Sequence, residues 1–168
     1  VVNEKLAKGS MRLADADEIA RLYGDLGQVV RISGGSAGNT VAGVASLTGK
    51  AAFIGKVAGD EFGEAYRHDM RGVGVAFDTS ALKDGAPTAS CLVLVTPDGE
   101  RTMSTFLGAC QALTPDDVDP AMVADAEVTF LEGYLWDPEQ AKEAFRKAAD
   151  IAHQNGRKVA LSLSDTFC

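Results

Sequence analysis

A strand–helix–strand unit in the C-terminal third constrains the fold of this chain more than any other sequence feature. Val128–Leu131 and Lys158–Ser164 are strand-length runs rich in apolar residues, and a helix-length segment separates them. One face of that helix carries apolar residues at helical spacing: Ala141, Phe145, Ala148 and Ala152. Two strands joined by one helix lie parallel, so the unit predicts an α/β fold with a central, mostly parallel sheet flanked by helices.

The N-terminal part also alternates strands and helices. Expected strands are Val29–Ile32 and Ala51–Val57, followed by an extended segment over Val73–Phe77. Expected helices are Asp15–Tyr23, Asn39–Leu47 and Glu61–Met70. Gly49 stands at the C-cap position of the second helix.

Two later segments carry the residues that begin helices. Thr114-Pro115-Asp116-Asp117 combines a capping threonine with proline and acids in the first turn. Asp137-Pro138-Glu139-Gln140 has the same order, and its glutamine completes a capping box. Farther along that helix, Glu143 and Lys147 are spaced for an ion pair.

A hairpin interrupts the α/β pattern in the middle of the chain. Thr88–Thr96 alternates, Pro97-Asp98-Gly99 is a turn signal, and Glu100–Thr105 runs back. With no helix attached, this hairpin at about 88–105 is a candidate lid, with the neighbourhood of Val29–Ile32 as a further part. Its exposed strand edges favour pairing with a second copy, so a homodimer through the lid is one expectation.

Composition excludes several classes of function. The net charge of −8 argues against a nucleic-acid-binding surface, and no apolar run has the length of a membrane span. No signal peptide is visible at the start. The cysteines Cys91, Cys110 and Cys168 form neither a disulfide framework nor a zinc motif, which indicates a reducing cytoplasm.

Ser33-Gly34-Gly35-Ser36-Ala37-Gly38-Asn39-Thr40 is the candidate binding loop. Glycines let the backbone approach a ligand closely, and the loop opens a helix. Its spacing does not fit the dinucleotide fingerprint, which argues against an NAD-linked enzyme. Gly43 to Gly49-Lys50 fails as a P-loop, because five residues separate the glycines and Ala51 replaces Ser or Thr.

The run from Gly34 to Gly63 resembles the first signature of the PfkB (ribokinase-like) carbohydrate kinases. The shared elements are the Gly-Gly pair, the Asn that opens a helix, and Gly59-Asp60-Glu61-Phe62-Gly63. The chain departs from the pattern at Val41, where a smaller residue is usual, and at Thr48 and Ala58, which replace glycines.

Later segments extend the resemblance over nearly the whole chain. Pro87-Thr88 with Pro97–Thr102 resembles the family's lid, and Leu131–Tyr134 and Leu161–Phe167 are similar to strands of its adenosine-kinase branch. The resemblance implies that residues 1–168 are the N-terminal part of one ribokinase-like domain. The family's first strand would precede Val1, and the half with the catalytic Asp and most of the ATP site would follow Cys168.

The resemblance assigns substrate contacts but no catalytic and no metal-binding residue to this chain. Gly35 and Asn39 would hydrogen-bond sugar hydroxyls, with Gly34 allowing close approach. The alternative for Asn39 is a helix N-cap. Tyr134 and Phe167 would lie against a base, and Leu107 and Ala109 would close over the nucleoside; core and hairpin packing are the alternatives. ATP and Mg²⁺ are implied cofactors.

Other polar residues have simpler interpretations. Asp60 either caps the helix that begins at Glu61 or orients the loop near the substrate. Arg101 is a solvated lid arginine or a phosphate contact, Asp165 is a loop acid, and His68 and His153 are surface residues.

Two classes of function therefore remain open. The first is the substrate-binding half of an ATP-dependent kinase of a nucleoside, adenosine first, or of a sugar such as ribose or fructose. The second is a non-catalytic sugar- or nucleoside-binding module. In either case these 168 residues alone are expected to be inactive as a kinase.

Overall fold

A computed structural model describes residues 6–164 of the chain. The α-helices are α1 (Ala16–Gly24), α2 (Ser36–Ser46), α3 (Glu61–Gly72), α4 (Pro120–Asp125) and α5 (Glu139–Gln154). Three short 3₁₀ helices are η1 (Gly108–Ala112), η2 (Pro115–Asp117) and η3 (Gly133–Leu135). The strands are β1 (Met11–Leu13), β2 (Ala51–Ala52), β3 (Val75–Ala76), β4 (Ser90–Val95), β5 (Arg101–Phe106), β6 (Val128–Glu132) and β7 (Lys158–Ser162).

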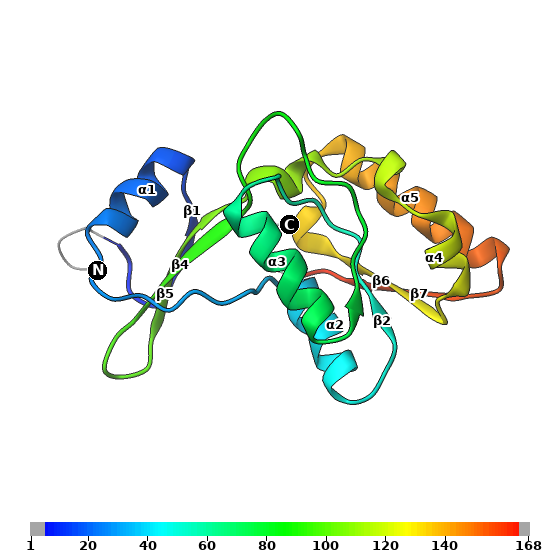
Figure 1. The fold of residues 1–168 in the computed structure, drawn as a ribbon, viewed down its shortest axis with the longest axis horizontal. Coiled ribbons are helices and arrows are strands. Elements are labelled where there is room, and N and C mark those ends of the chain that lie inside the picture. Colours follow the sequence, from blue (N-terminus) through cyan, green and yellow to red (C-terminus); the bar gives the residue numbers. More distant parts are fainter. Residues whose placement is uncertain (1–5, 165–168) are drawn as a thin grey trace.

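The chain forms two lobes, which Figure 1 shows side by side. The smaller lobe, called the lid below, contains α1 and a three-stranded sheet in the order β1-β5-β4. β4 and β5 are antiparallel, which confirms the predicted hairpin, and α1 lies against them. The remaining elements form the body. No helix of residues 6–164 combines the length and apolar character that a membrane crossing requires.

The third strand of the lid is not the one predicted. β1 pairs in parallel with β5, whereas the segment Val29–Ile32 is not a strand. That segment connects the lid to the body, and Val30 and Ile32 are 89% and 88% exposed. The prediction was wrong because apolar β-branched residues only favour a strand, whereas a hydrogen-bonded neighbouring strand is required, and within residues 6–164 this segment has none.

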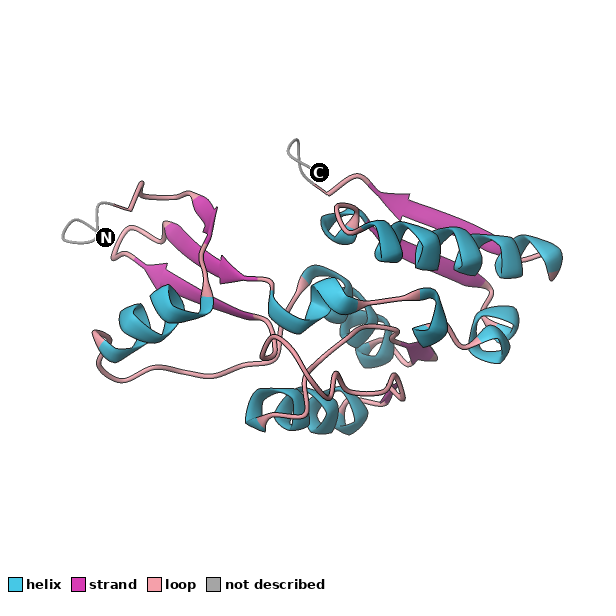
Figure 2. Ribbon diagram, turned by 90° about the horizontal axis from the view of Figure 1, so that it is seen from above, coloured by secondary structure: helices cyan, strands magenta, loops and turns pink. Residues whose placement is uncertain are grey.

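The body contains the predicted parallel pairs, but as two separate ladders. β6 and β7 pair in parallel over five residues, with α5 packed against both (Figure 2), which confirms the strand–helix–strand unit. β2 and β3 pair in parallel over two residues only. Within the described chain these ladders share no hydrogen bonds, so one continuous central sheet is not observed. The predicted strand over Ala51–Val57 is short because the amide of Gly55 bonds to the hydroxyl of Thr79 instead of a ladder carbonyl.

Two apolar clusters lie on opposite sides of the segment that follows β2. Phe53 and Val57 join a cluster with α2, α3 and β3 that is centred on Met70, Val75 and Phe77. Ile54 instead joins the α4–α5 cluster, which contains Leu113, Val118, Val123, Ala144, Ala148 and Ala152. The alternation of a strand therefore persists beyond β2, and helices cover both sides as an α/β fold requires.

The predicted helix starts are only partly correct. Thr114 and Asp117 do form a capping box, but it closes the single turn η2, and the helix α4 begins later, at Pro120. Asp119 caps α4 by accepting from the amides of Ala121 and Met122. A capping box closes a turn locally; whether the helix continues depends on the residues beyond it.

The start of α5 also differs in detail. Its N-cap is Pro138, without a side-chain hydrogen bond, so the capping box expected from Asp137 and Gln140 does not form. The expected ion pair between Glu143 and Lys147 is absent as well. The ammonium group of Lys147 instead donates to the carbonyl of Pro115 at 2.7 Å, because tertiary contact with η2 offers a less solvated acceptor.

The end of α2 places a threonine in an unfavourable backbone conformation. Thr48 has a φ of 66°, and the amides of Thr48 and Gly49 donate to Ala45 and Val44 carbonyls at 3.0 Å each. This is a Schellman motif, whose left-handed position glycine normally occupies. Gly49, expected at the C-cap position, lies two residues beyond the C-cap, which is Leu47.

Replacement of Thr48 by glycine is therefore expected to stabilise the protein. The left-handed conformation costs an L-residue about 1–2 kcal/mol, part of which the greater freedom of unfolded glycine offsets. We expect Thr48→Gly to raise the free energy of unfolding by about 1 kcal/mol in urea titrations. Gly49→Ala should do the opposite, because a Cβ there would lie 2.9 Å from the Val44 carbonyl oxygen. A destabilised Thr48→Gly variant would contradict this account.

Candidate acceptor-binding site

The glycine loop leads into α2 with open space beside it. Gly35 is the N-cap of α2, with a φ of 91° and a ψ of 144°, a conformation almost restricted to glycine. A Cβ added at Gly34 or Gly35 would meet no atom within 4 Å. At Gly38, by contrast, a Cβ would collide with the hydroxyl of Tyr66 on α3. Gly38 therefore serves helix packing, whereas Gly34 and Gly35 expose backbone to solvent.

Asn39 lies on α2 one turn after Gly35. Its amide nitrogen donates to the Gly35 carbonyl at 2.8 Å, so Asn39 is inside the helix, which begins three residues earlier than predicted. This excludes the N-cap interpretation of Asn39. The side chain is exposed, and its amide makes no hydrogen bond within residues 6–164. Asn39 thus presents both a donor and an acceptor beside the open glycine backbone.

A carboxylate that sequence reasoning missed joins this loop to the parallel strands. Glu132, the last residue of β6, accepts from the hydroxyl of Ser36 at 2.5 Å and from the hydroxyl of Ser164. These bonds hold the first turn of α2 against the carboxyl ends of β6 and β7, which is where α/β folds bind ligands. The signal was present in the sequence, because an acid ends an apolar strand at Leu131-Glu132.

The turn after β6 is closely packed and positions Tyr134. A Cβ at Gly133 would lie 2.5 Å from the Ser162 carbonyl oxygen of β7. The amide of Tyr134 donates to the hydroxyl of Ser164 at 3.1 Å, and the side chain of Tyr134 is 45% exposed. Tyr134 therefore lies at the same strand ends as Glu132. Phe167 and Asp165 lie outside the described residues.

The predicted lid residues occupy the base of the hairpin. Leu107 is half-buried and precedes η1, whereas Ala109 is fully buried. The amide of Ala109 donates to the carbonyl of Pro87 at 2.8 Å. No hydrogen bond joins either residue to the glycine loop in the described chain, so their contact with a substrate stays a prediction.

The described residues include no cluster of metal-ligating side chains. Within residues 6–164, no group of three or more His, Cys, Asp or Glu that could hold a metal ion is found. Arg101 is exposed at the start of β5, and His68 and His153 are exposed, as predicted. The polar groups at this end of the body are neutral hydroxyls and an amide, Ser36, Ser164 and Asn39, together with the carboxylate of Glu132.

The fold and this site together define a class: an α/β body with a β lid and an open glycine loop that leads into α2 near the ends of its parallel strands. Residues 10–168 match the pfkB family of carbohydrate kinases, and the chain belongs to that family. Kinases of this family transfer phosphate to alcohol acceptors, with ATP and Mg²⁺.

The relatives align with most of this chain, but the aligned part is only about half of each relative, or less. The crystal structure of adenosine kinase from Sinorhizobium meliloti is 53% identical, with a TM-score of 0.92 over 99% of this chain and 51% of that one. A probable sugar kinase from Rhizobium etli is 50% identical over the same share, also with a TM-score of 0.92. A Solanum tuberosum fructokinase is 31% identical over 76% of this chain and 40% of its own length. The chain thus spans about half the length of these relatives or less.

Proposed function

We propose that this chain is the acceptor-binding half of an ATP-dependent kinase that phosphorylates a primary hydroxyl of a nucleoside, adenosine being the first choice. The observation that carries the proposal is the pair formed by the open backbone of Gly35 and the exposed side chain of Asn39 at the start of α2, the helix whose first residue, Ser36, bonds to the carboxylate of Glu132. The 53% identity to a protein named adenosine kinase supports the choice of acceptor.

Each polar group at the site has a distinct role in this proposal. The amide of Asn39 donates to one sugar hydroxyl and accepts from its neighbour, which a vicinal diol requires. Gly34 and Gly35 let the ribose approach the backbone, since no side chain fills the space above them. Glu132 accepts from a further hydroxyl while Ser36 and Ser164 hold it in place.

Tyr134 distinguishes a nucleoside from a plain sugar. Its half-exposed ring follows β6 at the same edge of the body, where a purine can stack on it. Stacking of a base on an aromatic ring contributes about 1–3 kcal/mol in nucleic-acid complexes. Together with Phe167, and with Leu107 and Ala109 at the base of the hairpin, Tyr134 would enclose the base.

No catalytic residue is assigned to this chain. The roles proposed for its residues are binding, orientation and exclusion of water from the acceptor. The protein is proposed to be cytoplasmic, where the free thiols of Cys91 and Cys110 persist. A homodimer through the lid is consistent with β4 as an edge strand that exposes Val93 and Val95.

A second candidate acceptor is a plain sugar such as fructose. The potato fructokinase and the probable sugar kinase from Rhizobium etli both resemble this chain, and neither name implies a base. The hydroxyl-binding groups of the glycine loop would serve fructose or ribose equally well, whereas Tyr134 would then have no ligand to contact.

Phosphorylation of a panel of acceptors tests the proposal. The assay uses ATP, a protein of the relatives' full length that carries these residues, and adenosine, ribose or fructose as acceptor. We expect kcat/KM for adenosine to exceed that for either sugar at least tenfold, the value of 1.4 kcal/mol of stacking, and residues 1–168 alone to show no activity. Preference for a sugar would establish the second candidate. Binding without phosphorylation would indicate a non-catalytic module, and activity of residues 1–168 alone would refute the assignment as a half.

A further inference from the structure

The Gly59–Gly63 segment has no part in the acceptor site described above, although it is part of the family signature. Asp60 is the N-cap of α3 and makes no hydrogen bond to the glycine loop or to Glu132 within the described residues. Its carboxylate points instead to the start of the lid hairpin. We propose that Asp60 is a positioning residue that anchors the root of the lid to the body. Its effect on the acceptor rests on the function proposed above.

Asp60 makes more hydrogen bonds than a helix cap requires. One carboxylate oxygen accepts from the Gly63 amide at 2.8 Å and from the Thr88 hydroxyl at 2.6 Å. The other accepts from the Thr88 amide at 2.8 Å. The Thr88 hydroxyl also accepts from the Ala58 amide at 2.9 Å. Asp15, which caps α1, accepts only from the Glu18 amide, so the two bonds to Thr88 are an addition to capping.

The segment that enters the hairpin and the segment that leaves it lie together where Asp60 binds Thr88. Thr88 is only 7% exposed and lies two residues before β4. On the returning side, Gly108 has a φ of 52°, and a Cβ there would collide with the Pro87 carbonyl oxygen. The amide of Ala109 donates to that same carbonyl. A bond that fixes Thr88 therefore fixes both ends of the hairpin relative to α3.

The packing around Gly63 explains why the Gly59–Gly63 segment ends in glycine. A Cβ at Gly63 would collide with the Ala58 carbonyl oxygen and would lie 3.0 Å from the Thr88 hydroxyl oxygen. Any side chain at this position would push α3 away from Thr88. Asp60 and Gly63 thus serve the same contact, one by binding Thr88 and the other by leaving room for it.

The other connection between lid and body reaches the same turn of α3. Arg31, in the connector after α1, donates to Glu61 at 2.8 Å and to the Tyr23 hydroxyl at 3.4 Å. Its guanidinium lies 5.1 Å from the ring centre of Phe62. These groups are more exposed than Asp60 and Thr88, so they contribute less to holding the lid. Both connections between lid and body nevertheless contact the start of α3.

Asparagine cannot replace Asp60 in this arrangement. Partial burial acts to raise the pKa of Asp60, but the hydrogen bonds from Thr88 and Gly63 outweigh it and keep the pKa below its usual range. Asp60 is therefore an ionised acceptor with two oxygens at neutral pH. Asparagine offers one oxygen and one NH₂ group. In one orientation the NH₂ group would face the Thr88 amide, and in the other it would face the Gly63 amide and the Thr88 hydroxyl, so donor would meet donor in either case.

Hydrogen exchange of Asp60→Asn tests the anchor without any substrate. We expect the amides of Thr88 and Ala109 to exchange at least tenfold faster, with β6 and β7 unchanged. The matched control is Asp119→Asn, because Asp119 caps α4 with a single oxygen that asparagine retains. Asp119→Asn should leave the exchange rates unchanged both at Thr88 and Ala109 and in β6 and β7. Equal acceleration throughout the body, or no change at Thr88, would overturn the proposal.

Kinetics of the full-length protein separate positioning from mere stability. Asp60→Asn should raise the KM for the acceptor about tenfold while the KM for ATP stays the same, and Thr88→Val should behave alike. The double variant Asp60→Asn/Thr88→Val should have an acceptor KM no higher than that of the poorer single variant. Thr88→Ser keeps the hydroxyl and should have the KM of the wild type. Additive losses would overturn the anchor. Faster exchange at Thr88 in a protein without kinase activity would leave the anchor in place and refute the proposed function.

Discussion

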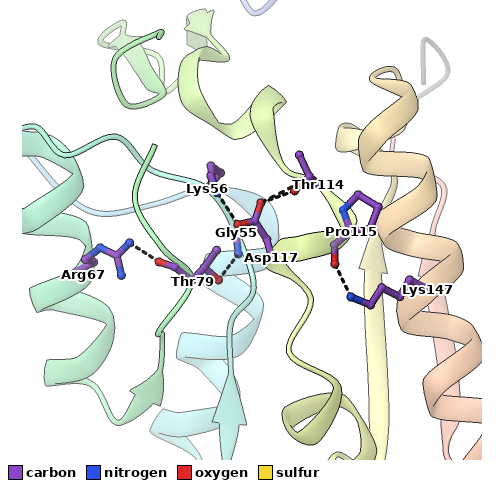
Figure 3. Close-up of polar contacts among 8 residues, drawn as sticks. All are labelled: Gly55, Lys56, Arg67, Thr79, Thr114, Pro115, Asp117 and Lys147. Carbon is purple, nitrogen blue, oxygen red and sulfur yellow. Dashed lines mark hydrogen bonds and ion pairs between the residues drawn. The ribbon is translucent and has the colours of Figure 1, made fainter. Parts of the chain in front are cut away.

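Lys56→Met is expected to lower the free energy of unfolding by about 3–5 kcal/mol. The ammonium group of Lys56 forms an ion pair with Asp117, and these side chains are 11% and 7% exposed (Figure 3). Without Lys56, the Asp117 carboxylate would remain buried with no opposite charge beside it. Its bonds from the amide and hydroxyl of Thr114, at 3.0 and 3.3 Å, do not neutralise that charge.

The position of this ion pair explains why so much depends on it. Lys56 follows Ile54 on the side of the segment that faces the α5 cluster, and Asp117 closes the turn η2. Lys147 from α5 binds the carbonyl of Pro115 in the same turn. Loss of Lys56 would therefore loosen the contact between the β2–α3 half of the body and the half built on α5.

Two companion variants make the measurement specific. Asp117→Asn in the Lys56→Met background removes the uncompensated charge but keeps an acceptor for Thr114, so it should recover most of the lost stability. Lys8→Met removes the exposed pair with Asp98 and should change little. Urea unfolding followed by the fluorescence of Trp136, the only tryptophan, gives each value. A loss below 1 kcal/mol, or a double variant less stable than Lys56→Met, would contradict the buried-pair account.

Local sequence patterns predicted most helices and strands, whereas the pairing of strands depended on contacts between distant segments. The hairpin of β4 and β5 and the unit formed by β6, α5 and β7 follow from periodicity and turn chemistry within each segment. The strand expected at Val29–Ile32 failed, and the three-residue β1 was missed, because both depend on which distant segment lies beside β5. The family resemblance was correct, since its motifs are contiguous in the sequence.

The candidate site was predictable to the same extent. Gly34, Gly35 and Asn39 lie within six consecutive residues of the sequence, and the structure keeps them together at the start of α2. Glu132 was missed because its place at the site depends on Ser36, 96 residues away. Asp60 was predicted as a helix cap, which is confirmed, but its bonds to Thr88 required the folded chain.

Asn39→Ala is expected to have the largest effect on activity. Loss of two hydrogen bonds to the acceptor, at about 1–1.5 kcal/mol each, corresponds to a fall in kcat/KM of about 30- to 150-fold. Alanine has the higher helix propensity, so α2 should not lose stability and the fall cannot be assigned to unfolding. Thr40→Ala is the matched control, because Thr40 is the exposed neighbour whose hydroxyl binds the Ser36 carbonyl. It should retain activity.

The most direct test of the central claim is the pair of KM values of Asn39→Ala in the full-length protein, one for the acceptor and one for ATP. The claim is that the glycine loop binds the hydroxyls of the acceptor and has no part in holding the phosphoryl donor. It predicts a large rise in the KM for adenosine with an unchanged KM for ATP. A raised KM for ATP with an unchanged KM for adenosine would contradict the claim and assign the loop to the nucleotide.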